Sequence, residues 1–180
     1  MQHRRCFLEL TATATAALVL PTLAIAQRGR YTSPAATAKA VIGGKDFSVD
    51  YYAPSMHGRK VMGGLVPYNE VWCTGANIAT GWTLGADIVI GDLKVPKGEY
   101  SIWTLPSEKD WTMILNKETG QFHLNYRQSL DLGRTKMLVK TLAEPVETFC
   151  VELRAEGKAT GVLALIWERT EAYLPFEVLG

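Results

Sequence analysis

The residues best suited to chemistry are concentrated in one stretch of the chain, Pro54–Trp82. This stretch is too long for a hairpin turn and lacks the alternation of a strand, and polar loops on a rigid scaffold commonly carry function. Its two neighbouring cations could bind a carboxylate or a phosphate group, and its WCTGAN sequence could offer hydrogen bonds beside a stacking indole. The residues predicted to line a ligand site are Arg59, Lys60, Trp72, Thr74 and Asn77.

The same side chains also have structural interpretations. Arg59 could pair with a carboxylate such as Asp50 or Glu70 and pin the loop, and the need to satisfy the polar groups of a long ordered loop favours this pairing. Thr74 and Asn77 could hydrogen-bond the local backbone and hold a turn. Binding and turn formation are therefore both open for the WCTGAN sequence.

Catalysis and metal binding would depend on the few histidines and cysteines. His57 or His123 could act as the base of a periplasmic hydrolase, and Ser55 lies two residues before His57. However, the chain has no G-x-S-x-G motif and no adjacent acid to orient a histidine. The histidines and Cys73 and Cys150 also lack the usual spacing of zinc ligands. We predict no catalytic residues, no metal site and no cofactor, and a hydrolase remains an alternative.

Residues 1–26 have the pattern of a bacterial export signal. Arg4 and Arg5 precede a weakly apolar run, Ala12–Leu20, and a small-x-small sequence ends at Ala26. The apolar run is shorter than the roughly 20 residues that span a bilayer, so we expect no transmembrane anchor. The mature protein would be periplasmic or secreted.

Two export routes fit this signal. The RRCFL sequence at Arg4 resembles the twin-arginine motif, two arginines followed by any residue and two apolar residues. Glu9 stands where a basic residue is common, which favours the general secretory route instead. Both routes remain open.

The charge of the mature chain limits the classes of partner it could bind, and its cysteines could form a disulfide. The whole chain has 19 Lys and Arg against 18 Asp and Glu, and loss of Arg4, Arg5 and Glu9 with the signal would leave it neutral. A neutral chain without basic clusters argues against nucleic acid as a partner. Because exported compartments are oxidising, Cys73 and Cys150 could form a disulfide, and otherwise they are small apolar fillers.

The rest of the chain predicts an all-β fold. Phe47–Tyr52 alternates apolar and polar residues after a Gly43-Gly44 turn, and similar short segments recur every 8–12 residues or so without a convincing helix. We predict a leader at 27–36 and one domain at 37–180, a jelly-roll-like antiparallel β-sandwich of about nine or ten short strands. Tryptophans of such a sheet most often belong to the core, and they are Trp82, Trp103, Trp111 and Trp167.

The C-terminal third is predicted to contain four separate strands. Pro145 and the residues around Gly157 mark loops between apolar segments, since both residue types interrupt strands. The segment directly before these strands, residues 121–133, could form a short helix or an irregular crossing. The four predicted strands are Lys136–Leu142, Thr148–Arg154, Val162–Trp167 and Tyr173–Val178.

Four segments of the chain together form a specific pattern: PSMHGRKVMGGLVPYNEVWCTGANIAT, LKVPKGEYSIWTLP, WTMILNKETGQF and VLALIWERTEAYLPF. This pattern resembles the bacterial exported family known as domain of unknown function 2911 (DUF2911). The resemblance implies a single exported β-rich domain with no established activity. The family pattern usually has a basic residue at His57, arginine at Cys73 and glutamate at Ile78, so this chain lacks charges that an arginine–glutamate pair would need.

These observations favour a non-catalytic ligand-binding module that uses the Pro54–Trp82 loop for a small or extended ligand. Two alternatives remain open. One is the periplasmic hydrolase with His57 or His123 as base, and the other is a structural or assembly subunit of an envelope complex.

Overall fold

The computed structural model describes residues 33–180, so the predicted signal peptide and most of the predicted leader lie outside the described residues. No helix in this described part is long and apolar enough to cross a bilayer. Residues 33–180 contain nine strands and one short 3-10 helix, η1 (Gln128–Leu130). The strands are β1 (Ala35–Ile42), β2 (Lys45–Tyr52), β3 (Thr80–Leu84), β4 (Ile88–Ile90), β5 (Leu93–Val95), β6 (Gly98–Leu105), β7 (Trp111–Asn116), β8 (Asp131–Ala155) and β9 (Thr160–Val178).

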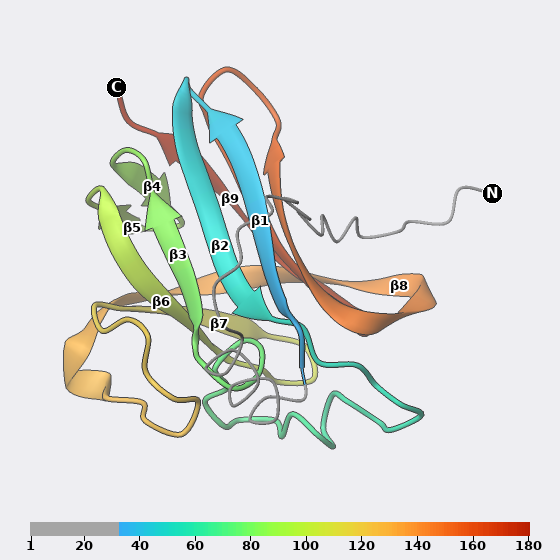
Figure 1. Ribbon diagram of the computed structural model, residues 1–180. Coiled ribbons are helices and arrows are strands. Elements are labelled where there is room, and N and C mark those ends of the chain that lie inside the picture. The colour runs from blue at the N-terminus through green and yellow to red at the C-terminus, as the bar shows by residue number, and fades with distance from the viewer. Residues whose placement is uncertain (1–32) are drawn as a thin grey trace, which may run out of the picture.

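The strands pair antiparallel in the order β1-β2-β3-β6-β7-β8-β9-β4-β5, which confirms the all-β prediction. Most strands that are neighbours in the sheet are also neighbours in the sequence. The exception is the β4–β5 hairpin, which lies between β3 and β6 in the sequence but pairs through β4 with β9. Figure 1 shows β1 and β2 crossing in front of β9, so the sheet folds over on itself. The two faces brought together in this way enclose the core.

Aromatic rings from both sides of the fold meet in this core. The ring of Phe176 in β9 lies 5.6 Å from Phe47 in β2 and 5.5 Å from Trp82 in β3, and Tyr51 meets Phe149 at 5.6 Å. Such tilted and edge-on pairs are the preferred aromatic geometries. The prediction that four tryptophans are core residues is confirmed, since none is more than 2% exposed: Trp82, Trp103, Trp111 and Trp167.

The first hairpin follows the predicted pattern. Gly43 and Gly44 turn between β1 and β2 with φ of +62° and +71°, values that glycine adopts without a Cβ penalty. The alternating apolar residues of β2 face the core. However, β1 begins at Ala35, inside the predicted leader at 27–36, because its first residues pair with the end of β2. Residues 35 and 36 of the predicted leader therefore belong to β1.

The four strands predicted near the C-terminus are two long, bent strands instead. β8 pairs with β7 as far as Met137 and then with β9, and its register shifts on both sides of Val146. Pro145, which has no backbone N–H, lies at this irregularity, and Glu168 opposite Val146 has a φ of +52°. Bulges bend a strand without ending it, so one hairpin continues from one part of the sheet to the other.

Candidate functional site

The Pro54–Trp82 loop is attached to the sandwich near both of its ends. At its start, Met56 N donates to Glu147 O at 2.9 Å, and Phe149 N donates to Pro54 O at 2.8 Å. Towards its end, Trp72 and Thr104 exchange two backbone hydrogen bonds of 2.8 and 2.9 Å. Backbone hydrogen bonds to β8 and β6 therefore hold the loop against the sheet.

Trp72, a predicted ligand-binding residue, packs against the core. Its ring lies 6.0 Å from Trp167 in a stacked arrangement, and Trp111 and Phe149 approach it edge-on. Its indole N–H donates to the carbonyl of Gly75 at 3.0 Å. Trp72 is therefore held in the aromatic core, and its indole donor is already used within the loop.

Thr74, another predicted ligand-binding residue, is fully buried. Its carbonyl accepts a 2.6 Å hydrogen bond from Thr80 Oγ1, and its own hydroxyl lies 3.2 Å from Thr104 Oγ1. Its φ of +57° makes the turn at this point. Thr74 thus belongs to the support of the loop.

Asn77 connects the loop with two other segments. Its side-chain N–H group donates to Ser33 O at 3.5 Å, and its carbonyl accepts the backbone N–H of His123 at 2.9 Å. Its φ of +62° is one that asparagine tolerates better than most residues. Asn77 therefore links the start of the described chain to the loop that follows β7.

A pocket of about 410 Å³ opens beside the beginning of the central loop. Its volume falls in the usual range of small-molecule sites, about 300–1,000 Å³. Its wall combines apolar residues with two hydroxyls, one imidazole and one guanidinium, and contains no acidic side chain. The lining residues are Ser33, Pro34, Ala53, Pro54, Ser55, His57 and Arg59.

Arg59 carries the strongest charge of this pocket. Its Nε donates to Met56 O and its Nη2 donates to Ser55 O, both at 2.8 Å. Among residues 33–180, no carboxylate forms an ion pair with Arg59. The favoured pairing with Asp50 or Glu70 is therefore wrong: Arg59 does pin the loop, but it uses neutral carbonyls and keeps its full charge.

Lys60, the adjacent predicted site residue, is exposed and does not line the pocket. Its carbonyl accepts the backbone N–H of Leu65 at 3.1 Å, which begins a tight turn. The structure thus brings Arg59 to a pocket and does not bring Lys60, Trp72 and Thr74 to its wall.

His57 lies at the pocket with an unusual backbone conformation, a φ of +49°. Its backbone N–H donates to the carboxylate of Glu147 at 2.8 Å, so this carboxylate neighbours the pocket. The hydroxyl of Ser55 lies 2.8 Å from Thr148 Oγ1. Within the described chain, no hydrogen bond connects the His57 imidazole with Ser55 or with an acid, so a nucleophile–base–acid arrangement is not assembled there.

Comparison with known proteins assigns the family at this point. Residues 33–176 match the model of a protein family of unknown function, DUF2911. The chain belongs to the DUF2911 family. The searches of curated proteins and of solved structures found no match. The family resemblance inferred from the sequence is confirmed, and it covers the pocket and all but the last two residues of the sheet of this DUF2911 protein.

The disulfide considered between Cys73 and Cys150 is not formed, because Cys73 is a free thiol. Cys73 packs with Trp103 and Ile114, whereas Cys150 packs in a separate cluster with residues of β9. Burial raises the pKa of the Cys73 thiol to about 12, which makes it unreactive at neutral pH. In residues 33–180, no group of three or more His, Cys, Asp or Glu is arranged to hold a metal ion.

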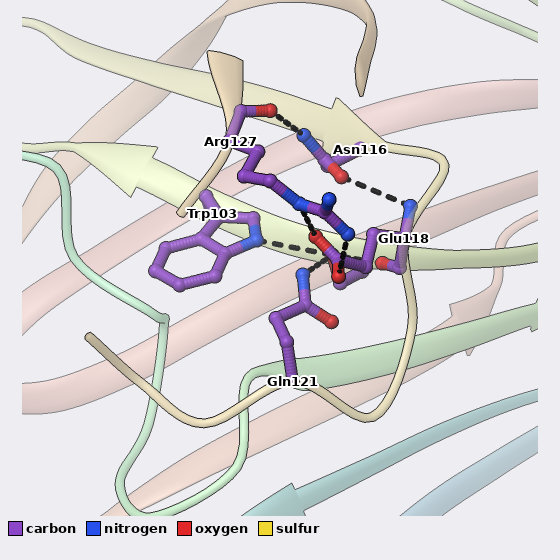
Figure 2. Close-up of polar contacts among 6 residues, drawn as sticks. Trp103, Asn116, Glu118, Gln121 and Arg127 are labelled. Atoms are coloured by element: carbon purple, nitrogen blue, oxygen red, sulfur yellow. Dashed lines mark hydrogen bonds and ion pairs between the residues drawn. The ribbon is translucent and has the colours of Figure 1, made fainter. Parts of the chain in front are cut away.

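A polar network that the sequence did not reveal holds the second long loop of this DUF2911 protein, residues 117–130. Figure 2 shows side chains of β6, β7 and this loop converging. Ser101 Oγ accepts from Trp103 Nε1 at 3.0 Å and from Gln121 Nε2 at 2.9 Å, and it donates to Glu118 O at 2.7 Å. Fully buried Asn116 adds bonds to both ends of the loop.

An exposed ion pair closes the same loop. Arg127 donates to both carboxylate oxygens of Glu118, and this contact lowers the pKa of Glu118. The backbone of Gln121 also accepts Ala79 N at 3.0 Å, which joins the network to the end of the central loop. The sequence could not predict this network, because its polar residues are separated along the chain and only the fold brings them together.

The pocket itself was only partly foreseeable. The loop that contains Arg59 was selected by its density of polar residues, and Ser55 and His57 were noted within it. Ser33 and Pro34 lie in the predicted leader, about 20 residues before the loop, and their contribution depends on the pairing of β1 with β2. No periodicity or motif could have indicated this.

Proposed function

We propose that this DUF2911 protein is an exported, non-catalytic binding protein that takes a small ligand with an anionic group in the pocket beside Arg59. The observation that supports the proposal is the state of Arg59, which lines a pocket without acidic side chains and has no carboxylate partner among residues 33–180. Arginine at a protein surface usually finds a carboxylate or water. An unneutralised guanidinium that is fixed in place is suited to binding an anion from solution.

The fixed position of Arg59 favours binding further. Its two hydrogen bonds to Met56 O and Ser55 O already restrict the side chain before any ligand arrives. Ordering a long side chain is one of the costs of association, so restriction in the free protein improves affinity. The pinning role of Arg59 and a binding role are therefore compatible.

A non-catalytic role agrees with the surroundings of the histidines. The carboxylate of Glu147 accepts the backbone N–H of His57, and the Ser55 hydroxyl is hydrogen-bonded with Thr148. A hydrolase with His57 or His123 as base would need an oriented nucleophile, and these contacts supply none. The export signal predicted at residues 1–26 would deliver the protein to the periplasm or outside the cell, where a ligand from the surroundings is accessible.

The proposal is tested by mass spectrometry of the mature protein purified from its own exported fraction. Native spectra should show an added mass that is lost when the protein is denatured, and the released compound should be anionic in negative-ion mode. A chain that carries no added mass, even after incubation with an extract of its surroundings, would count against a binding function. The same spectra report the cleavage site, which is expected after Ala26.

A further inference from the structure

We infer that the ligand of the Arg59 pocket binds through a carboxylate group carried on a small apolar body, and not through a phosphate. This inference rests on the proposed function, since it names the chemical class of the ligand for the same pocket. Three observations lead to it: the free edge of the guanidinium, the supply of backbone donors and the charge beside the pocket.

The guanidinium of Arg59 has one bidentate edge left for a ligand. Nε and Nη2 form the side edge of the group, and both donate to loop carbonyls. The end edge, made by Nη1 and the second N–H of Nη2, has no hydrogen-bond partner among residues 33–180. Two parallel N–H groups match the two oxygens of a planar carboxylate, which is the geometry of a paired arginine and carboxylate.

Most residues of the pocket wall offer no free backbone N–H group. Pro34 and Pro54 have none, and the N–H groups of Ala53, His57 and Arg59 donate to Pro34 O, a Glu147 carboxylate oxygen and Met56 O. Phosphate sites usually depend on several free backbone N–H groups that converge on the oxygens. Five of the seven lining residues therefore cannot serve a phosphate in this way, whereas a carboxylate needs only the two donors of Arg59.

Charge beside the pocket points in the same direction. The Glu147 carboxylate lies 2.8 Å from the backbone nitrogen of His57, and Lys60 does not line the pocket. A phosphate ester itself carries close to two negative charges. Beside Glu147, these charges would be balanced by only one permanent cation, Arg59. A carboxylate carries a single charge, which Arg59 balances alone.

The remaining wall suits an apolar body. Pro34, Ala53 and Pro54 line the pocket and offer it no free backbone donor. An aliphatic or aromatic group can cover this side and leave no polar group of the wall unpaired. The structure thus indicates a small organic acid, with its carboxylate at Arg59 and its apolar part at the prolines.

The test compares probes that share one body and differ in the polar head: hexanoate, hexyl phosphate and hexanol, titrated into the mature protein and followed by calorimetry and NMR. Hexanoate should bind at least about tenfold more tightly than hexyl phosphate and hexanol, as expected for a charged hydrogen-bonded pair. This comparison uses the wild-type protein, so it does not depend on how a variant folds. Equal or tighter binding of hexyl phosphate would overturn the carboxylate inference and leave the proposed function standing.

Variants then separate charge from geometry. Arg59→Lys keeps the charge but has no planar fork, so it should lose about tenfold or more in hexanoate affinity, as should Arg59→Gln. Lys60→Gln removes the neighbouring cation outside the pocket and should bind hexanoate like the wild type. Undiminished binding by Arg59→Lys would overturn the bidentate contact. Failure of hexanoate to bind would overturn the carboxylate inference, and the proposed function would then be decided by whether the exported protein carries a bound mass.

Discussion

The carboxylate of Glu168 in β9 accepts the backbone N–H of Met62 at 3.0 Å, across 106 residues of sequence. The same carboxylate accepts Val61 N at 3.3 Å. Val61 and Met62 are buried in the main core, so their N–H groups have no access to bulk water. Glu168 itself has a φ of +52° at the bend of the long hairpin. This contact fastens the middle of the central loop to the point where β9 changes direction.

Replacement of Glu168 should therefore destabilise the protein. In Glu168→Ala, two backbone N–H groups lose their acceptor, which should lower the free energy of unfolding by about 1–3 kcal/mol. Urea denaturation followed by tryptophan fluorescence measures the change. Glu177→Ala is the matched control, because Glu177 is an exposed residue of the same strand and should have little effect. Equal stability of the two variants would show that the Glu168 contact does not hold the loop.

Two glycines of the loop provide a test of its packing. Gly58 and Gly63 have nearly the same φ, +72° and +73°, so alanine at either position incurs the left-handed backbone penalty of about 1–2 kcal/mol. A Cβ at Gly63 would lie 2.6 Å from Tyr68 Cε2, whereas a Cβ at Gly58 would have nothing within 4 Å. Gly63→Ala should be less stable than Gly58→Ala by about a further 1–3 kcal/mol. Thermal unfolding of both variants decides this, and equal melting temperatures would contradict the packing of Tyr68 on Gly63.

Burial of the Cys73 thiol predicts a pH dependence of stability. Its pKa is raised from the ordinary value of 9.0 to about 12, so above pH 9 the unfolded chain releases a proton that the folded chain retains. Stability from this group is complete below pH 9 and falls as the pH rises towards 12, with a slope of up to about 1.4 kcal/mol per pH unit. Unfolding of the wild type and Cys73→Ala, measured between pH 8 and about pH 10.5, should show a steeper loss in the wild type.

Comparison with Cys73→Ala is needed because tyrosines also titrate in this range. Burial raises the pKa values of Tyr51 and Tyr126 as well, but these groups are present in both proteins. The difference between the two curves isolates the thiol. Parallel curves would contradict a buried, protonated Cys73. Slow reaction of Cys73 with a thiol reagent at pH 8, followed by rapid reaction after denaturation, gives an independent check.

The network shown in Figure 2 allows a comparison of buried and exposed contacts on one loop. Ser101→Ala leaves the N–H groups of Trp103 and Gln121 without their acceptor inside the protein, which should cost about 2–4 kcal/mol. Arg127→Ala removes the exposed ion pair with Glu118, which water and salt already weaken, and should have a much smaller effect. Urea denaturation of both variants tests this order. A larger effect of Arg127→Ala would mean that the ion pair, and not Ser101, holds the loop.

Local signals were sufficient to predict much of the fold. The alternation of Phe47, Val49 and Tyr51 and the Gly43-Gly44 turn depend on neighbours in sequence, and the structure agrees with both. Local signals could not predict that β8 and β9 continue through Pro145 and Glu168. Pairing with the opposite strand keeps each of them extended through the bend, and this pairing is absent from a single sequence.

The candidate site shows the same division. Polar and aromatic residues of the central loop were predicted as a group, yet Trp72 and Thr74 are supports and Arg59 is a pocket residue. Their chemistry alone does not separate these roles, because an indole or a hydroxyl can serve either. The absence of a carboxylate partner for Arg59 among residues 33–180 is a tertiary property, and it is the property on which the proposed function depends.

The most direct test of the binding function compares Arg59→Gln with Lys60→Gln by native mass spectrometry after purification from the exported fraction. These adjacent cations differ in that Arg59 lines the pocket and Lys60 does not. We expect the wild type and Lys60→Gln to carry the same bound anion, and folded Arg59→Gln to lack it. Retention of that mass by Arg59→Gln, or its loss from Lys60→Gln alone, would contradict a ligand site at Arg59.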